Sequence, residues 1–325
     1  MRRVSSLTLI TLLLLLLANP GNAQVSFSGF FDVQYLKPEP DQDLFTGFQY
    51  GQFEIDVAAD FSHRIRTAGS LVLNTETQEF EPGEGYLSLD FSASQSSFNH
   101  DRIIQRTQLL IGQFYVPFGI DHRVISSIDR SLVHAPLINR RTIDSWNSVG
   151  AQLITHASEW NATLFVVRSF VQGITAGGRI GLNLTRDMEM GISYAKDVYN
   201  AQLPGSNLFG TDLKWLFHHF SLKGEAVFSQ GVLNGTTSDQ SVYHWGYYSQ
   251  VKYDILRLRR IPMFLVARYG QWQPRLGIDS QTTPPEKRVT MGGGVRLAYQ
   301  TEIRVEYMAN FRDNRTLTFQ FAVGF

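Results

Sequence analysis

The sequence contains no cysteine among its 325 residues, which excludes disulfides, catalytic thiols and thiolate metal sites. It also lacks an excess of charge of either sign, because 29 lysines and arginines face 29 aspartates and glutamates. This balance gives no reason to expect nucleic-acid binding. The usual enzyme fingerprints are missing too: there is no Gly-x-Ser-x-Gly, no His-Glu-x-x-His and no glycine-rich phosphate or dinucleotide loop.

Long apolar runs are missing as well, except for one at residues 7–17. Two arginines precede this run, and Pro, Gly and small residues follow it up to Ala23. The run is too short for a comfortable membrane-spanning helix, so the pattern favours a cleaved signal peptide over an anchor. We therefore predict a signal peptide at residues 1–23 and a single exported domain at residues 24–325, with a net charge of −2 once Arg2 and Arg3 are removed.

The chain does show a regular alternation of apolar and polar residues. From Thr316 to Phe325, every odd position is apolar and every even position is polar or small. Successive side chains of a strand point to opposite faces, so this segment is a strand with one apolar and one polar face. About ten tilted residues cross a hydrocarbon core of roughly 30 Å. An edge strand of a soluble sandwich would show the same pattern, so this segment alone leaves both folds open.

The same alternation recurs along the exported domain. It predicts about sixteen strands, with a range of about 14 to 18 because strand boundaries are the weakest part of such predictions. The expected ranges are 26–36, 48–61, 65–75, 85–91, 106–114, 148–157, 160–168, 178–185, 188–196, 208–217, 220–229, 243–255, 261–271, 287–299, 302–311 and 316–325.

Charge alternates with apolar residues in several of these segments. In a soluble sandwich the charged face would be the outside, whereas in a membrane barrel the apolar face meets lipid and the charged face lines a watery lumen. On the second reading the lumen wall includes Lys223, Glu225, Arg288, Arg296, Glu302, Arg304 and Glu306.

The lengths of the connections decide between the two readings. Short connections occur at 62–64, 158–159, 186–187, 218–219, 256–260 and 300–301. Long ones occur at 37–47, 76–84, 115–147, 169–177, 197–207, 230–242 and 272–286. Short and long connections fall on opposite ends of the strands, apart from a long 92–105 and a short 312–314, as in outer-membrane barrels. We predict an all-β fold, a transmembrane antiparallel β-barrel.

The third long connection, residues 115–147, exceeds the usual loop length, and such loops are commonly functional. It holds apolar residues that a solvated loop would not need, so we expect it to fold into the lumen and pack on the wall. Its charges are candidates for a constriction that sets ion selectivity. A compatible alternative is that its arginines pair with its aspartates to pin the loop. These residues are Asp121, Arg123, Asp129, Arg130, Arg140, Arg141 and Asp144.

The segment entering this connection, Gly112-Gln113-Phe114-Tyr115-Val116-Pro117-Phe118-Gly119, resembles the Gly-Gln-Phe-Lys-x-Pro-Phe-Gly motif of the phosphate-selective porin O/P family. The resemblance implies a 16-stranded, homotrimeric porin of the outer membrane, in contact with its lipids and lipopolysaccharide. Tyr115 replaces the motif's Lys, and the long connection carries four arginines against three aspartates. We therefore expect a passive pore for small hydrophilic solutes or ions with a mild anion preference at most.

Two other functions remain open. One is a closed or plugged barrel with a structural or adhesive role, and the other is a barrel enzyme that pairs Ser or Asp with His. Sixteen strands leave an aqueous lumen, which favours the channel.

Adjacent residues in a tight turn point apart, so His218-His219 is expected to be an exposed turn and not a metal pair. Gly292-Gly293-Gly294 is expected to give curvature or room for an aromatic ring. We expect no catalytic activity, metal or cofactor.

Phe325 is expected to be an assembly signal, because outer-membrane barrels of this kind end in an aromatic strand that the barrel-assembly machinery reads. Deleting Phe325 should lower the amount of folded protein in the outer membrane, measured by heat-modifiable gel mobility. An unchanged folded yield would remove this role from the residue.

Overall fold

The computed structural model describes residues 24–39, 46–74, 79–91, 104–123, 126–142, 146–169, 173–198, 206–232, 241–258, 261–276, 284–311 and 315–325. The predicted signal peptide, residues 1–23, lies outside the described residues, as does Asp144. None of the helices in the described part of the chain is long and apolar enough to cross a membrane.

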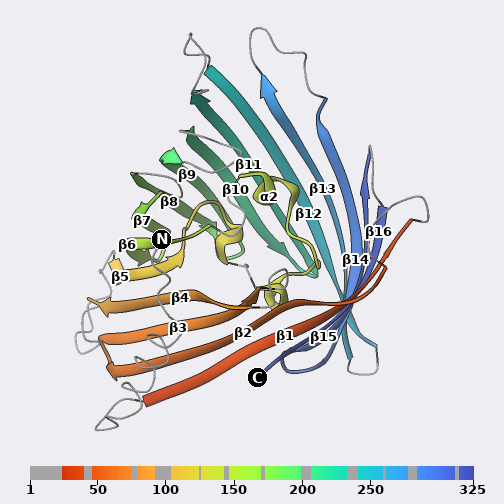
Figure 1. Ribbon diagram of the computed structural model, residues 1–325, viewed down its shortest axis with the longest axis horizontal. Coiled ribbons are helices and arrows are strands. Elements are labelled where there is room, and N and C mark those ends of the chain that lie inside the picture. The colour runs from red at the N-terminus through yellow and green to blue at the C-terminus, as the bar shows by residue number, and fades with distance from the viewer. Residues whose placement is uncertain are drawn as a thin grey trace.

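Sixteen antiparallel strands form one closed barrel, in which each strand pairs with its neighbours in sequence and β1 pairs with β16 (Figure 1). The prediction of sixteen strands is confirmed. The strands are β1 (Gln24–Pro38), β2 (Gly47–Ser62), β3 (Ile65–Asn74), β4 (Glu79–Asp90), β5 (Ile104–Tyr115), β6 (Asn147–Ala157), β7 (Trp160–Arg168), β8 (Ile174–Thr185), β9 (Met188–Val198), β10 (Ser206–Phe217), β11 (Phe220–Val232), β12 (Ser241–Leu258), β13 (Ile261–Leu276), β14 (Glu286–Ala298), β15 (Thr301–Asn310) and β16 (Arg315–Gly324).

Several strands are longer than the alternation predicted, and β4 differs most. It begins at Glu79, whereas the sequence predicted a start at residue 85. Pro82 and Gly83 look like a turn in the sequence, but Pro82 pairs with Leu71 beside a shift in the β3–β4 register. A bulge of this kind tolerates a proline that cannot donate a backbone hydrogen bond.

The polarity of the strands is inverted relative to a soluble protein. On β15 and β16, Arg304 and Glu306 are 2% and 1% exposed, whereas Val305 and Phe319 are 39% and 42% exposed. Water outside the barrel would favour the opposite arrangement, but lipid outside and a polar interior favour this one. The transmembrane assignment is therefore confirmed. Residue alternation places all the predicted wall residues on the inward face: Lys223, Glu225, Arg288, Arg296, Glu302, Arg304 and Glu306.

Tight turns join β2 to β3, β6 to β7, β8 to β9, β10 to β11 and β14 to β15 at one end of the barrel, as the sequence predicted. The pairing of Phe217 with Phe220 leaves His218-His219 as an exposed two-residue turn. His218 and Gln300 take left-handed conformations in their turns, with φ of 54° and 57°. Positive φ values of this kind match the twist of paired strands.

The seam between β1 and β16 ends in a reciprocal backbone pair. The Phe325 amide donates to the Gly29 carbonyl over 2.9 Å, and the Gly29 amide donates back to the Phe325 carbonyl over 3.0 Å. The Phe325 ring lies over Gly29, where a larger residue would meet it. This pairing extends the closure of the barrel to the end of β16, since in lipid an open edge would leave backbone groups unpaired.

The exposed apolar face generates a stability prediction. Val305 lies on the outward face near the middle of β15, so Val305→Arg should cost about 2–4 kcal/mol if that level meets the bilayer midplane. Denaturant titration of the barrel in lipid vesicles measures this loss. Tyr299→Arg, in the exposed β14–β15 turn, is the control and should cost about 1 kcal/mol or less. Equal losses in the two variants would contradict the inside-out assignment.

Candidate functional site

The β5–β6 connection (residues 116–146) carries η1 (Asp121–Arg123), η2 (Ser127–Asp129) and α2 (Leu137–Thr142). Short helix η2 contacts β1 and β16, and α2 contacts β12 and β13 (Figure 1). In the order of strands around the barrel, β12 and β13 lie almost opposite β5. The connection therefore reaches from its own strands to the far side of the ring.

The porin-like motif lies where the sequence expects it, at the end of β5 and the start of the connection. Gly112 has φ of 141°, and a side chain there would collide with the Gly85 carbonyl. Gly119 has φ of 69° and lies against the Glu225 carboxylate, again with no room for a side chain. Both motif glycines are thus required by backbone conformation and by close approach. Between them, Phe118 is completely buried.

Inward-facing glycines of the wall leave space for apolar side chains of the connection. A Cβ built on each glycine would crowd its partner: Gly210 with Phe118 at 3.0 Å, Gly246 with Ile138 at 2.8 Å, and Gly292 with Leu132 at 2.9 Å. Gly294 likewise leaves room for the Phe264 ring, so the expectation of room for an aromatic within Gly292-Gly293-Gly294 is confirmed. These apolar contacts hold the backbone of the connection close to the wall.

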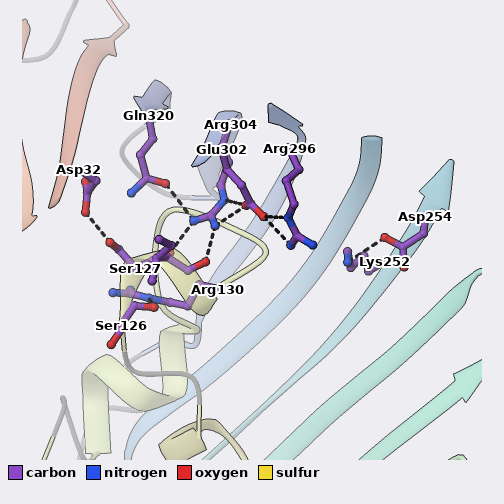
Figure 2. A network of polar contacts seen from close by, with 11 residues as sticks. Asp32, Ser126, Ser127, Arg130, Lys252, Asp254, Arg296, Glu302, Arg304 and Gln320 are labelled. Carbon is purple, nitrogen blue, oxygen red and sulfur yellow. Dashed lines mark hydrogen bonds and ion pairs between the residues drawn. The ribbon is translucent and has the colours of Figure 1, made fainter. Parts of the chain in front are cut away.

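Arg304 of β15 fastens η2 to the wall (Figure 2). Its Nη1 donates to the Ser127 carbonyl over 2.5 Å, and its Nη2 donates to the Ile128 carbonyl over 2.7 Å. Glu302 orients the guanidinium through Oε2, at 2.9 Å from Nε and 2.6 Å from Nη2. Arg296 pairs with the other Glu302 oxygen at 2.6 Å and makes no contact with the connection among the described residues. Charge-assisted bonds of this kind are the strong ones.

Strands β1 and β2 hold the same short helix from the other side. The Ser127 hydroxyl donates to Asp32 Oδ2 over 2.5 Å, and its amide donates to Gln52 Oε1 over 2.6 Å. Gln34 supports Asp32 through a 2.8 Å bond. Arg130 donates to the same Gln52 oxygen over 3.2 Å, so it acts here as an anchor of the connection.

The middle of the connection is tied to the opposite wall. His134 donates its amide to Glu306 Oε2 over 3.2 Å, and Arg268 donates to the His134 carbonyl over 2.6 Å. Asp121 forms an ion pair with Lys223 and accepts a 2.9 Å bond from Asn139. Burial alone would raise the pKa of Asp121, but the Lys223 ammonium outweighs it and holds this pKa below its usual value. Asp121 therefore stays ionised as a partner for Lys223.

The remaining predicted arginines of the connection behave differently from one another. Arg140 and Arg141 are adjacent residues of α2. Arg141 pairs with Glu286 at 2.7 Å, whereas Arg140 has no acidic partner among the described residues. Arg130 and Arg141 contact Gln52 and Glu286 of the wall, whereas the alternative expected them to pair with the connection's own aspartates. The side chain of Arg123 lies outside the described residues, as does Asp144.

Two cavities flank the connection. One, of about 330 Å³, adjoins β10–β13 and is lined by Lys214, Lys223, Lys252 and Arg268 among others. The other, of about 450 Å³, adjoins β2–β4 and is lined by Glu54, Asp56 and Glu84 among others. His122 and Asp129 line both. Burial raises the pKa of Asp129, which lies where the two cavities adjoin.

Acids therefore outnumber bases around the β2–β4 cavity, where Arg66 is also present, and bases outnumber acids around the β10–β13 cavity. In a ring of sixteen strands, β2–β4 and β10–β13 lie on opposite sides. The sequence prediction missed most of these residues, although their inward alternation and strand number could have placed them: Glu54, Asp56, Glu84, Lys214, Lys252 and Arg268. It also missed Arg179, whose Nη2 lies 2.6 Å from Asp212 and whose Nη1 lies 3.0 Å from Glu189. The described residues hold no group of three or more His, Asp or Glu side chains suited to a metal ion.

No family model and no curated protein matches the chain in sequence. Solved structures do match in fold. The anion-selective porin of Comamonas acidovorans aligns over 93% of this chain and 100% of its own, with a TM-score of 0.68 and 11% identity. OmpF of Salmonella typhi, in complex with daunomycin, aligns over 93% and 97%, with a TM-score of 0.66 and 10% identity. A loop-deletion form of OmpT, an outer membrane protein of Vibrio cholerae, aligns over 93% and 99%, with a TM-score of 0.66 and 10% identity. The chain has the porin fold. The match is to the porin class, and it does not single out the phosphate-selective subfamily that the motif resembles.

Arg304→Gln should loosen η2, because two carbonyls of the connection lose their charged donor. A Ser126→Cys substitution gives a single reporter thiol in this cysteine-free chain, and its labelling rate measures the motion. Labelling should be about tenfold faster with Arg304→Gln, as expected for a lost charged hydrogen bond of about 1.5 kcal/mol or more.

Arg296→Gln is the matched control for this experiment. It removes an arginine from the same Glu302 carboxylate but no contact to the connection, so labelling should stay at the parent rate. Equal rates in both variants would show that Arg304 does not hold η2.

Proposed function

We propose that the protein is an outer-membrane porin, a passive diffusion channel for small hydrophilic solutes and ions that is narrowed by the β5–β6 connection. The observation that carries the proposal is the uneven charge across the lumen, with an excess of acids around the β2–β4 cavity and an excess of bases around the β10–β13 cavity. A barrel that only anchored or filled the membrane would not need such a field. A narrow aqueous passage between walls of opposite charge selects solutes by charge and dipole.

The base-lined side gives the channel its selectivity in this proposal. Among the described residues, Arg140 and Lys214 form no ion pair with an acid, so their positive charges act on ions in the passage. The acidic wall opposes it, so the net preference for anions is mild. Arg130 and Arg141 position the connection, and Arg140 faces the passage. The signal peptide, the homotrimer, and contacts with lipopolysaccharide and the barrel-assembly machinery belong to the same proposal.

A closed barrel is the second candidate, because a specific observation favours it. The connection is fastened at η2, at His134 and at α2, and the anchoring side chains Arg304 and Glu306 are almost fully buried. A plug needs such fastening. The cavities on both sides of the connection favour the channel.

Single-channel recording in planar bilayers distinguishes the two candidates. The channel proposal expects stepwise conductance, and deleting residues 126–137 should increase it. Folded protein that shows no conductance until these residues are removed would favour the plug. A deletion that lowers conductance or leaves it unchanged would place the connection outside the passage.

Charge reversal tests the assigned role of Arg140. Arg140→Glu should move the reversal potential in a salt gradient toward cation preference, because its side chain lacks an acidic partner and its charge is poorly screened in confined water. Arg141→Glu should mainly lower the folded yield, since it sets two acids against each other at Glu286. Lys287→Glu, on the outward face at the end of β14, should change neither. If Arg140→Glu left the reversal potential unmoved, this arginine would be part of the scaffold.

A further inference from the structure

We propose that the cavity beside β10–β13 is a binding station for small organic carboxylates that carry an apolar body, such as a single-ring aryl acid. The proposal rests on the channel function and names the solute class that this site would favour. The cavity of about 330 Å³ is lined by the connection on one side and by inward-facing residues of β10–β13 on the other. Its volume is at the lower end of the range for small-molecule sites.

The charges of the cavity favour an anion. Its basic lining residues are Arg130, Arg140, Lys214, Lys223, Lys252 and Arg268, and its acidic ones are Asp121, Asp129 and Asp254. Lys223 pairs with Asp121, and Lys252 pairs with Asp254 at 2.8 Å. Within the described ranges Lys214 and Arg140 have no acidic partner. Two cations that line the cavity, one from β10 and one from α2, are therefore left for a ligand carboxylate.

Cross-strand register places three of these bases in one row. Lys214 lies opposite Lys223, Lys223 opposite Gln250, and Gln250 opposite Arg268. Neighbouring like charges in a row repel one another, and a bound anion relieves this repulsion. The Asp121 carboxylate relieves this repulsion at Lys223 only. Arg268 donates a 2.6 Å hydrogen bond to the His134 carbonyl. On its other side Lys214 lies opposite Glu189 of β9, but that carboxylate is paired with Arg179 at 3.0 Å, so Lys214 has no ion pair of its own in the part of the chain that the structure describes.

Six further lining residues are apolar, beside polar ones such as Asn139 and Gln250, and this apolar part distinguishes an organic acid from an inorganic anion. Val116, Ile120, Leu132, Pro136, Trp146 and Leu216 face the same cavity. Leu216 follows Lys214 by two residues, so both project from the same face of β10. Apolar surface removed from water contributes about 25 cal/mol per Å², a gain that phosphate or chloride cannot realise. A carboxylate near Lys214 would place its ring against Leu216 and the apolar part of the connection.

Block of ion conductance tests the station. Phenylacetate added on one side of a bilayer in potassium chloride should reduce single-channel conductance saturably, at a lower concentration than acetate or phosphate. Neutral 2-phenylethanol should not reduce it. Block by phosphate at the same concentration as phenylacetate would show a simple anion site and refute the role of the apolar lining. Equal block by 2-phenylethanol would refute the requirement for a carboxylate.

Variants locate the station. Lys214→Gln should weaken the phenylacetate block about tenfold, as expected for one lost charged hydrogen bond, while Lys214→Arg should retain it. Lys287→Gln, on the outward face, is the control and should match the parent. Parent-like block in Lys214→Gln would remove this lysine from the site and refute the assignment.

Calorimetric titration of the detergent-solubilised barrel with phenylacetate separates this proposal from the channel function. If phenylacetate binds, Lys214→Gln weakens this binding and the barrel does not conduct, the channel function is refuted and the binding station is supported. Conductance without saturable binding would support the channel and refute the station.

Discussion

Two different solvents act on the two faces of every strand, and the rest of the structure depends on this constraint. Lipid outside the barrel favours an outward position for Val305 and Phe319, while Arg304 and Glu306 face the interior and find polar partners there. Because lipid offers no hydrogen bonds, the sheet must also close on itself, which the β1–β16 pairing achieves. An interior that can hold charge follows from this arrangement, and with it comes the chance to sort charge around the ring.

Much of the fold could be predicted because its signals are local. Alternation has a period of two, so each strand shows its inward residues without any knowledge of its partners, and the unequal connections fix which end is which. Glu302, Arg304 and Glu306 could be assigned to the interior in this way. The start of β4 could not, because Pro82 is tolerated only through a register shift that arises between two strands.

The site was harder to predict, because its parts come together only in the closed ring. Nothing near Arg304 in sequence indicates that it holds carbonyls of residues 127 and 128. A glycine that receives Leu132 or Ile138 looks in sequence like a glycine that bends a strand. The long connection could be recognised by its length and apolar content, but its helix α2 could not, since six residues are too few for periodicity to show.

The ring topology also determines the order in which contacts can form. Every pairing but one joins strands adjacent in sequence, so the sheet can grow one hairpin at a time at a small cost in loop closure. Until β16 meets β1, however, the growing sheet carries two exposed edges, which are templates for association with other chains. Closure removes both edges in a single long-range step. The chain therefore remains open to edge-to-edge association until its two end strands meet.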